Sequence, residues 1–356
     1  QKFLNNALDF AQQSKWHKAL AIYEALLKNE PDNIELINKI SIIYSQIGEY
    51  TKAYEWMEKI LDRKTTDAEF ISNFSVICLR LNLIEKAEYL INFSIKIEPT
   101  NIIYLLNLAG IYNVREEYLK SLETIKLALN INPLHAGAYG LFGITLIKIG
   151  ENSSARDALE LALKIDPTFL EAKFNLASLE QKDGNTQKAI SLYESLVYER
   201  TNDINSLSLE AIKFNLSGLY LSEGKLELGW EFVEFGFHPQ VAPEYRRNPG
   251  RTFNKKRWNG DIQENKNILV WREQGVGDEI MYLGCLPDLI DTGMNIIVET
   301  DERLVPLLSK SFPSCLIRAQ MYNIYSHDKK PYIEDYDFQI PVGSLPRLFR
   351  KTIESF

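Results

Sequence analysis

The sequence predicts an α-helical solenoid over residues 1–237, a basic connector over 238–265 and an α/β lobe over 266–356. Three observations support this division. Small residues recur every 34 positions through the first two thirds of the chain, and proline or threonine closes each of these units. After Lys266 the apolar residues change to short runs of strand type, which alternate with helical stretches. The length of 356 residues suits two domains of roughly 150 residues or more.

Each 34-residue unit is predicted to form two antiparallel helices. One series of small residues comprises Ala19, Ala53, Ala87, Ser121, Ala155 and Ala189, and a second comprises Ala7, Ser41, Ser75, Ala109, Gly143 and Ala177. Small residues at facing positions let two helices approach closely. Glycines fall between the helices, where a left-handed residue ends the first helix, at Gly48, Gly150, Gly184 and Gly224. Since one hairpin cannot bury its own apolar face, we expect the units to stack.

The fourth unit carries a known pattern at Ala109, Tyr112, Ser121, Ile125, Ala128 and Pro133. In these residues the chain resembles the tetratricopeptide repeat, over about seven repeats in residues 1–237. The resemblance implies a protein or extended peptide partner on the concave face. The position that the family places on this face holds Asn5, Asn73, Asn107, Asn175 and Asn215. Their amides can donate and accept hydrogen bonds, and the repeats are similar to those of O-linked N-acetylglucosamine transferases, which carry such an asparagine ladder. The alternative is that these amides bond neighbouring helices.

The connector is rich in basic residues, at Arg246, Arg247, Arg251, Lys255, Lys256 and Arg257. We interpret it as an irregular, solvated linker that lies against an acidic solenoid. The alternative is a clamp for phosphate or nucleic acid.

The lobe is predicted to contain strands at 268–271, 295–300, 316–318 and 337–340, with helices at 279–290, at 302–310 and from about Ser344. Strands that alternate with helices predict a parallel sheet with Rossmann-like winding. The loop Gly275-Val276-Gly277 and the later Glu299 partly match a dinucleotide-binding fingerprint. However, Asp278 would place a carboxylate where a pyrophosphate should lie, which disfavours that function.

Several motifs occur in a characteristic order: Gly229-Trp230-Glu231 in the last repeat, Trp258-Asn259-Gly260, Glu273-Gln274-Gly275-Val276-Gly277-Asp278 and Gly343-Ser344-Leu345-Pro346. They resemble a bacterial family that joins tetratricopeptide repeats to a GT-B type, heptosyltransferase-like glycosyltransferase module. The resemblance implies that Asp278 is the catalytic base on the acceptor side. It also implies that Glu273, Gln274, Gly275 and Gly277 bind the substrate. The alternative role of Asp278 is to cap its helix.

Only 91 residues follow from Lys266 onward, which is enough for one of the two lobes of a GT-B enzyme. The resemblance therefore implies a partial, truncated GT-B module. A full-length protein would be an inverting, metal-independent glycosyltransferase, with a nucleotide-sugar donor only if a second lobe exists. We expect the 356-residue chain alone to be inactive. The alternative function is a non-catalytic protein-interaction scaffold.

Composition excludes several classes of function. Lys and Arg number 40 against 48 Asp and Glu, a formal charge of −8, so we expect no nucleic-acid partner. No apolar run approaches the roughly 20 residues of a membrane span. Cys78, Cys285 and Cys315 are scattered, which disfavours a disulfide framework and a metal site. We expect a cytoplasmic protein without metal or cofactor, and self-association through the end repeats stays open.

Overall fold

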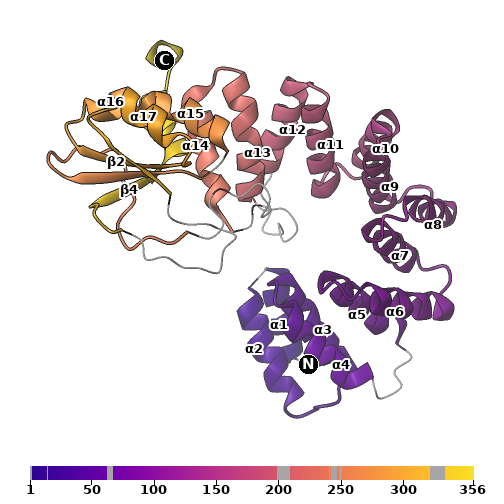
Figure 1. The fold of residues 1–356 in the computed structure, drawn as a ribbon. Helices are drawn as coiled ribbons and strands as arrows, with labels where there is room; N and C mark the ends of the chain where they lie inside the picture. Colours follow the sequence, from indigo (N-terminus) through magenta and orange to yellow (C-terminus); the bar gives the residue numbers. More distant parts are fainter. Residues whose placement is uncertain are drawn as a thin grey trace. The chain divides into compact units, whose positions relative to one another are not determined.

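A computed structural model describes residues 2–13, 15–61, 67–198, 209–239, 241, 247, 251–273, 275–320 and 333–356. The chain divides into two compact units, Gln1–Leu207 and Ser208–Phe356, whose helices and strands are drawn in Figure 1. In the part of the chain that the structure describes, no helix is both long and apolar enough to cross a membrane.

The first unit is a stack of six helical hairpins, in which each helix packs against the next one in the chain. The solenoid predicted from the 34-residue period is therefore confirmed. Its helices are α1 (Lys2–Gln12), α2 (Trp16–Leu27), α3 (Ile34–Gln46), α4 (Tyr50–Leu61), α5 (Ala68–Arg80), α6 (Ile84–Ile97), α7 (Ile102–Val114), α8 (Tyr118–Ile131), α9 (Ala136–Ile149), α10 (Asn152–Ile165), α11 (Leu170–Lys182) and α12 (Thr186–Tyr198).

The small residues lie where the two helices of a hairpin meet. Ala87 and Ala109 are fully buried, as are the serines that replace alanine at this contact. The Ser75 hydroxyl donates to the Ala87 carbonyl at 2.9 Å, and the Ser121 hydroxyl donates to the Ala109 carbonyl at 3.0 Å. A buried hydroxyl must find a partner, so serine fits this position by bonding the backbone of the facing helix.

In the described chain a left-handed residue ends the first helix of six hairpins, the last of them at Gly224 with φ of +74°. Gly48, Gly150 and Gly184 have φ of +82°, +86° and +81°, and the equivalent residues Asn82 and Glu116 have φ of 60° and 62°. Glycine adopts this conformation without steric cost. The turn is therefore set by the backbone at this position, even in the two described hairpins where Asn82 and Glu116 replace glycine.

The second unit joins a seventh hairpin to the α/β lobe. Helix α14 packs against α18 within this unit. The elements are α13 (Leu209–Ser222), α14 (Leu226–Val233), η1 (Glu234–Phe237), β1 (Asn267–Trp271), α15 (Val276–Tyr282), η2 (Leu283–Cys285), α16 (Leu286–Ile290), β2 (Asn295–Thr300), α17 (Val305–Ser311), β3 (Leu316–Ala319), β4 (Phe338–Pro341), η3 (Val342–Ser344), α18 (Leu345–Phe349) and η4 (Ile353–Ser355).

The four strands form one parallel sheet in the order β3-β2-β1-β4, as the alternating pattern predicted. The outer side of β4 is also paired, because the Gln339 N–H donates to the Lys256 carbonyl at 3.1 Å and the Trp258 N–H donates to the Gln339 carbonyl at 2.8 Å. A paired edge cannot recruit another chain. The connector therefore closes this side of the sheet.

The two faces of the sheet are covered differently. Ile268 and Val270 of β1 belong to a cluster with Leu286, Leu289 and other buried residues that follow the strands. The alternate residues Leu269 and Trp271 face a second cluster, against which Phe237 and Phe253 pack. Because side chains alternate along a strand, helices cover one face and residues from η1 and the connector cover the other.

Candidate functional site

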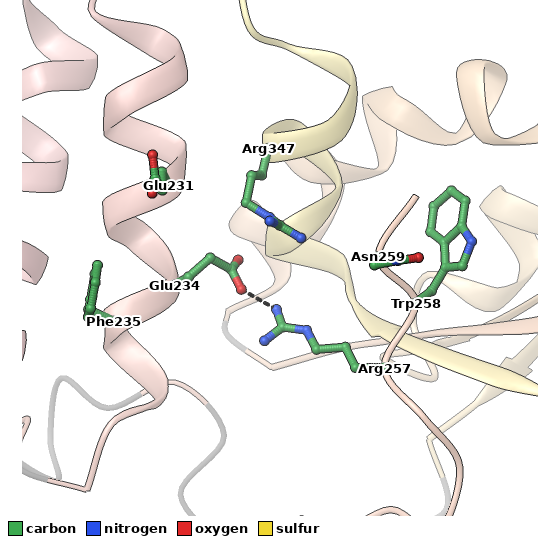
Figure 2. Close-up of a pocket in the computed structure, with 7 residues that line it drawn as sticks. All are labelled: Glu231, Glu234, Phe235, Arg257, Trp258, Asn259 and Arg347. Atoms are coloured by element: carbon green, nitrogen blue, oxygen red, sulfur yellow. Dashed lines mark hydrogen bonds and ion pairs between the residues drawn. The ribbon is translucent and has the colours of Figure 1, made fainter. Parts of the chain in front are cut away.

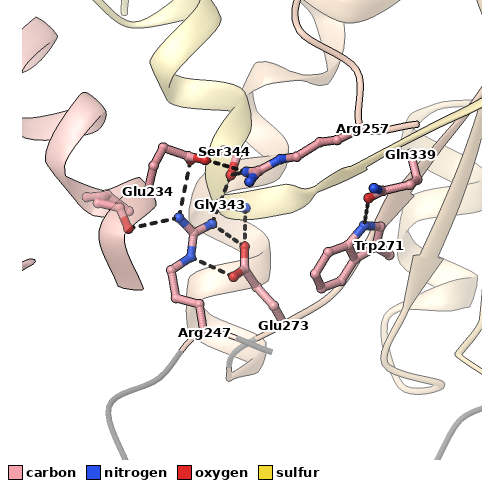
Figure 3. A network of polar contacts seen from close by, with 9 residues as sticks. Glu234, Arg247, Arg257, Trp271, Glu273, Gln339, Gly343 and Ser344 are labelled. Atoms are coloured by element: carbon pink, nitrogen blue, oxygen red, sulfur yellow. Dashed lines mark hydrogen bonds and ion pairs between the residues drawn. The ribbon is translucent and has the colours of Figure 1, made fainter. Parts of the chain in front are cut away.

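Several of the sequence motifs meet beyond the carboxyl ends of β1 and β4. Glu273 follows β1, Gly343 and Ser344 follow β4, and Glu234 begins η1 after the last helical hairpin. Figure 3 shows these residues around the guanidinium groups of Arg247 and Arg257. The carboxyl ends of parallel strands are where α/β proteins generally bind ligands, so this polar network is the natural place to look for a site.

The centre of the network is a buried ion pair. The side chains of Arg247 and Glu273 are 1% and 0% exposed. Arg247 Nε donates to Glu273 Oε2 at 2.6 Å and its Nη2 donates to Oε1 at 2.5 Å, a two-point contact that is among the stronger types of hydrogen bonding. The Gly343 N–H also donates to Oε1, at 3.0 Å. A Cβ at Gly343 would lie 2.9 Å from both charged groups, so glycine leaves room for the pair.

Arg247 also links this pair to the last helical hairpin. Its Nη1 donates to the Val233 carbonyl at 3.3 Å and to Glu234 Oε1 at 3.4 Å. Burial is the largest single influence and would lower the pKa of Arg247. The charge and hydrogen bonds of Glu273, together with the charges of Glu234 and Tyr282, outweigh it and raise the pKa of Arg247 above its usual value. The arginine therefore stays charged within the interior of the second unit.

Arg257 extends the network towards solvent. It forms an ion pair with Glu234, and its Nη2 donates to the Ser344 hydroxyl oxygen at 2.6 Å. Arg247 Nη2 donates to the same oxygen at 3.1 Å. Burial is the main cause that lowers the pKa of Arg257, and the nearby charges of Arg247 and Arg347 lower it further, against the opposite effect of Glu234.

A second buried pair lies in the same unit. Arg251, with 2% of its side chain exposed, donates to Glu299 Oε2 at 2.7 Å. Arg318 donates to Oε1 of the same carboxylate at 2.8 Å. The prediction of a solvated connector is therefore wrong for Arg247 and Arg251, because each is buried and has a carboxylate partner that compensates for its burial. The partner is Glu273, just after β1, for Arg247 and Glu299 of β2 for Arg251. Glu299, which the dinucleotide hypothesis would place on a ribose, is held by two arginines.

A pocket of about 460 Å³ opens beside the network. Figure 2 shows Arg257, Trp258 and Asn259 from the connector on one side, Arg347 from α18 above them, and the end of the last hairpin opposite. The hairpin contributes Glu231, Glu234 and Phe235 to the lining. Sequence reasoning missed Arg347, although it directly follows the Gly343-Ser344-Leu345-Pro346 motif.

The glycine loop Gly275-Val276-Gly277 lies at the start of α15. Gly275 precedes α15, and its N–H donates to Asp278 Oδ2 at 3.1 Å. This is the contact that the helix-cap alternative predicts. A Cβ at Gly277 would meet no atom within 4 Å, so within the described chain nothing crowds this glycine. Gln274 lies outside the described residues.

The predicted peptide-binding asparagines, Asn5, Asn73, Asn107, Asn175 and Asn215, are called the asparagine column below. Those of the first unit take part in packing. Asn73 Nδ2 donates to Asn38 Oδ1 at 3.1 Å, and Asn107 Nδ2 donates to the Ser72 hydroxyl at 3.1 Å. Both contacts reach the preceding hairpin. Asn175 Nδ2 donates instead to the Glu171 carbonyl of its own helix at 2.7 Å. The side chain of Asn5 lies outside the described residues, and Asn215 lies on α13 of the second unit.

Known proteins share the repeats. Residues 4–68, 136–169 and 171–201 match tetratricopeptide repeat families. Protein FlbA of Caulobacter vibrioides is 24% identical over 368 aligned residues, which cover 100% of this chain and 60% of FlbA. The peroxisomal targeting signal receptor of Kluyveromyces lactis is 26% identical over 174 residues, which cover 47% of this chain and 30% of the receptor. The chain thus spans less than two thirds of either relative.

A solved structure shows the same fold. The crystal structure of a tetratricopeptide repeat protein from Parabacteroides merdae superposes with a TM-score of 0.51 at 17% identity, over 68% of this chain and 96% of that protein. These matches support the repeats, and the FlbA match also spans the α/β lobe. None of them shows a glycosyltransferase module or a similarity to O-linked N-acetylglucosamine transferases. The helical part of this chain is a tetratricopeptide-repeat solenoid, as its 34-residue period predicts.

Proposed function

We propose that this chain is a protein-interaction scaffold whose repeats bind an extended peptide of a partner protein. The observation that carries the proposal is the stack of six hairpins, with tetratricopeptide matches near both of its ends. Stacked hairpins present a long row of equivalent side chains on their first helices. Such a row suits an extended chain, whose groups also repeat along its length. The peroxisomal receptor that this chain resembles is named for a targeting signal, which is consistent with a repeat surface that holds peptides.

The asparagine column is the proposed binding row. The side-chain amide of asparagine has two N–H groups on Nδ2 and a carbonyl acceptor, while the contacts of Asn73 and Asn107 to the preceding hairpin are each one hydrogen bond from Nδ2. Both residues are half-buried. A side chain that packing already orients loses less entropy when it binds a ligand. The packing contacts therefore favour recognition of a peptide backbone along this row.

The second unit has a supporting role in this proposal. Trp230 of α14 packs edge-on against Tyr282 of α15, with ring centroids 6.2 Å apart, and the Arg247 network joins the same hairpin to the sheet. Terminal repeats need a partner or a polar outer surface to cover their apolar face. The lobe thus caps the seventh hairpin. Glu273 is fully engaged by Arg247, which disfavours a role in binding sugar.

A peptide-selection experiment tests the proposal. The 356-residue chain would be screened against a phage-displayed library of random 15-residue peptides, and the affinity of the selected peptides measured by fluorescence anisotropy. The test variant N73A/N107A/N175A loses three half-buried amides of the first helices. The matched control N92A/N130A loses two amides of the second helices α6 and α8.

We expect the test variant to bind selected peptides at least about tenfold more weakly, because each lost hydrogen bond contributes about 0.5–1.5 kcal/mol. The control should bind as the parent does. Circular dichroism would establish that both variants remain helical. Peptide binding along the asparagine column would be refuted if the library yields no binder, or if N73A/N107A/N175A and N92A/N130A bind the selected peptides with equal affinity.

A second candidate function is sugar transfer, with Asp278 orienting the acceptor hydroxyl. It is favoured by one observation, the strand order β3-β2-β1-β4, which is that of the first strands of doubly wound, Rossmann-like sheets. Asp278 lies after β1 and is half-buried. The test is a transfer assay with radiolabelled nucleotide-sugars on a longer protein that also carries a donor lobe, because we expect the 356-residue chain alone to be inactive. In that protein D278N should abolish the signal, while D291N, at the exposed end of α16, preserves it. Equal transfer by D278N would exclude the residue from the mechanism.

A further inference from the structure

We propose that two copies of this chain associate face to face through an apolar surface on α6 and α8, in the middle of the helical stack. The surface, called the apolar face, consists of exposed side chains on the second helices of two consecutive hairpins: Tyr89, Phe93 and Ile97 of α6 and Leu119, Leu127 and Ile131 of α8. The asparagine column lies on the first helices, so this association is independent of peptide binding.

The side chains of the apolar face form a stripe along each helix. Tyr89, Phe93 and Ile97 follow one another at intervals of four residues, as Leu127 and Ile131 do, and this spacing places side chains on one side of a helix. Phe93 and Leu127 are 34 residues apart, so they occupy equivalent positions of successive hairpins. The two stripes therefore lie side by side along the stack.

An arginine links the two helices of the apolar face. Arg115 forms ion pairs with Glu88 in the first half of α6 and with Glu117, the residue that precedes α8. The start of α8 is thus held beside α6.

The second helices of the other hairpins are polar at the most exposed positions of this face. At the position of Tyr89, helices α4, α10 and α12 carry the exposed residues Glu55, Asp157 and Ser191. At the position of Leu119, they carry the exposed residues Thr51, Ser153 and Gln187. The packing of the repeats therefore does not require apolar side chains here. Exposed apolar patches that the fold does not require mark interaction surfaces.

The exposed area suits a protein interface. Tyr89 and Leu119 are 72% and 74% exposed, and the other members of the face are 38–56% exposed. With about 200 Å² for a fully exposed side chain of this size, these fractions amount to about 650 Å². Each partner of a stable complex contributes about 800 Å². The apolar face thus supplies most of the area that one side of a dimer interface needs.

The charges beside the apolar face favour a second copy as the partner. Glu85 is the second residue of α6, and Lys96 is the second from its end. Glu123 and Lys126 are the sixth residues from the start and from the end of α8. All four residues are exposed. When two copies of a helix pack antiparallel, residues at equal distances from the two ends lie opposite each other, so each of these acids faces a base of the second copy.

A two-fold axis along the stack produces this arrangement. Rotation about an axis that lies in the interface and crosses the helices sets α6 on α6 and α8 on α8, and it reverses the direction of both. It also brings Leu119, near the start of α8, close to Ile131 at the end of α8 in the second copy. Because such a contact is isologous and closes with two copies, the proposal specifies a dimer.

Sedimentation equilibrium of the 356-residue chain tests the proposal, at about 0.15 M salt to screen the net charge. We expect the mass to rise towards twice 41.0 kDa as the concentration increases from about 1 to 100 µM. Y89E/L119E should weaken dimerisation at least about tenfold, because the interface would bury unpaired carboxylates. The matched control S153E/S191E adds the same charges at the equivalent exposed positions of α10 and α12, and it should dimerise within about twofold of the parent. Circular dichroism would establish that both variants remain helical.

Charge reversal tests the orientation of the two copies. K96E sets an acid against Glu85 of the second copy and should weaken dimerisation about threefold or more, since each dimer loses two ion pairs. E85K/K96E exchanges the charges and should restore the affinity of the parent. The proposal is overturned if the chain remains monomeric at about 100 µM, or if Y89E/L119E and S153E/S191E dimerise equally well. Equal dissociation constants for K96E and E85K/K96E would overturn the antiparallel arrangement.

Discussion

The substitution E273Q tests whether the Arg247–Glu273 pair holds the second unit together. Glutamine has nearly the shape of glutamate, but it leaves the charge of Arg247 buried without its main partner. Breaking a buried ion pair costs about 3–5 kcal/mol. Glu234 lies 3.4 Å from Arg247 Nη1 and compensates for part of the lost charge. We therefore expect a loss of about 3 kcal/mol, at the lower end of that range.

Tryptophan fluorescence can follow the second unit alone. The chain has five tryptophans, and replacing Trp16 and Trp56 of the first unit by phenylalanine leaves only Trp230, Trp258 and Trp271, all in the second unit. In urea, a loss of 3 kcal/mol would lower the midpoint by about 1–3 M, because the slope for small domains is about 1–3 kcal/mol per molar.

Two further variants complete this test. E302Q removes an exposed carboxylate of the same unit and should leave the midpoint unchanged. The double variant R247M/E273L removes both charges together and should lose less stability than E273Q, because no unpaired charge remains. A midpoint for E273Q equal to that of the parent would show that the ion pair does not hold the unit together.

Three other predictions concern the repeats. A189F places a ring at a fully buried helix contact and should cost about 1–3 kcal/mol, measured by thermal unfolding. G150A should cost about 1–2 kcal/mol in the same assay through backbone strain alone, since φ is +86° and a Cβ would meet nothing within 4 Å. Burial raises the pKa of Glu180, but hydrogen bonds, that from Lys188 first, outweigh it and lower the pKa to about 2. The stabilisation is present above the ordinary value of 4.5 and lost as the pH falls towards 2, so E180Q should flatten acid unfolding in this window.

The regular elements could be predicted from the sequence because their signals are local. The small residues of a hairpin, such as Ser75 and Ala87, are close in the chain, and their 34-residue repetition is visible without knowledge of the fold. The strands can equally be predicted, since Ile268–Trp271 and Ile296–Val298 are apolar runs bounded by polar residues. Local periodicity is the strongest signal in a single sequence.

The burial of the connector could not be predicted, because its cause is distant in the chain. Arg247 and Arg251 read as surface residues by composition, and their partners Glu273 and Glu299 lie 26 and 48 residues away. Glu273 was assigned to substrate binding by resemblance, with no sign of the arginine that engages it. Arg347 was overlooked for the same reason, as only the folded chain brings α18 to the connector.

The central place of β1 in the sheet has a consequence for biosynthesis. Each hairpin of the first unit is complete as soon as its own 34 residues have left the ribosome, so the solenoid can grow during translation. Leu269 of β1, in contrast, pairs with Gln339 of β4, and must wait until this much later strand emerges. Pairing between such distant segments is slow. We therefore expect the α/β lobe to fold after the repeats that precede it, and premature termination before β4 to leave β1 as an open, aggregation-prone edge beside finished repeats.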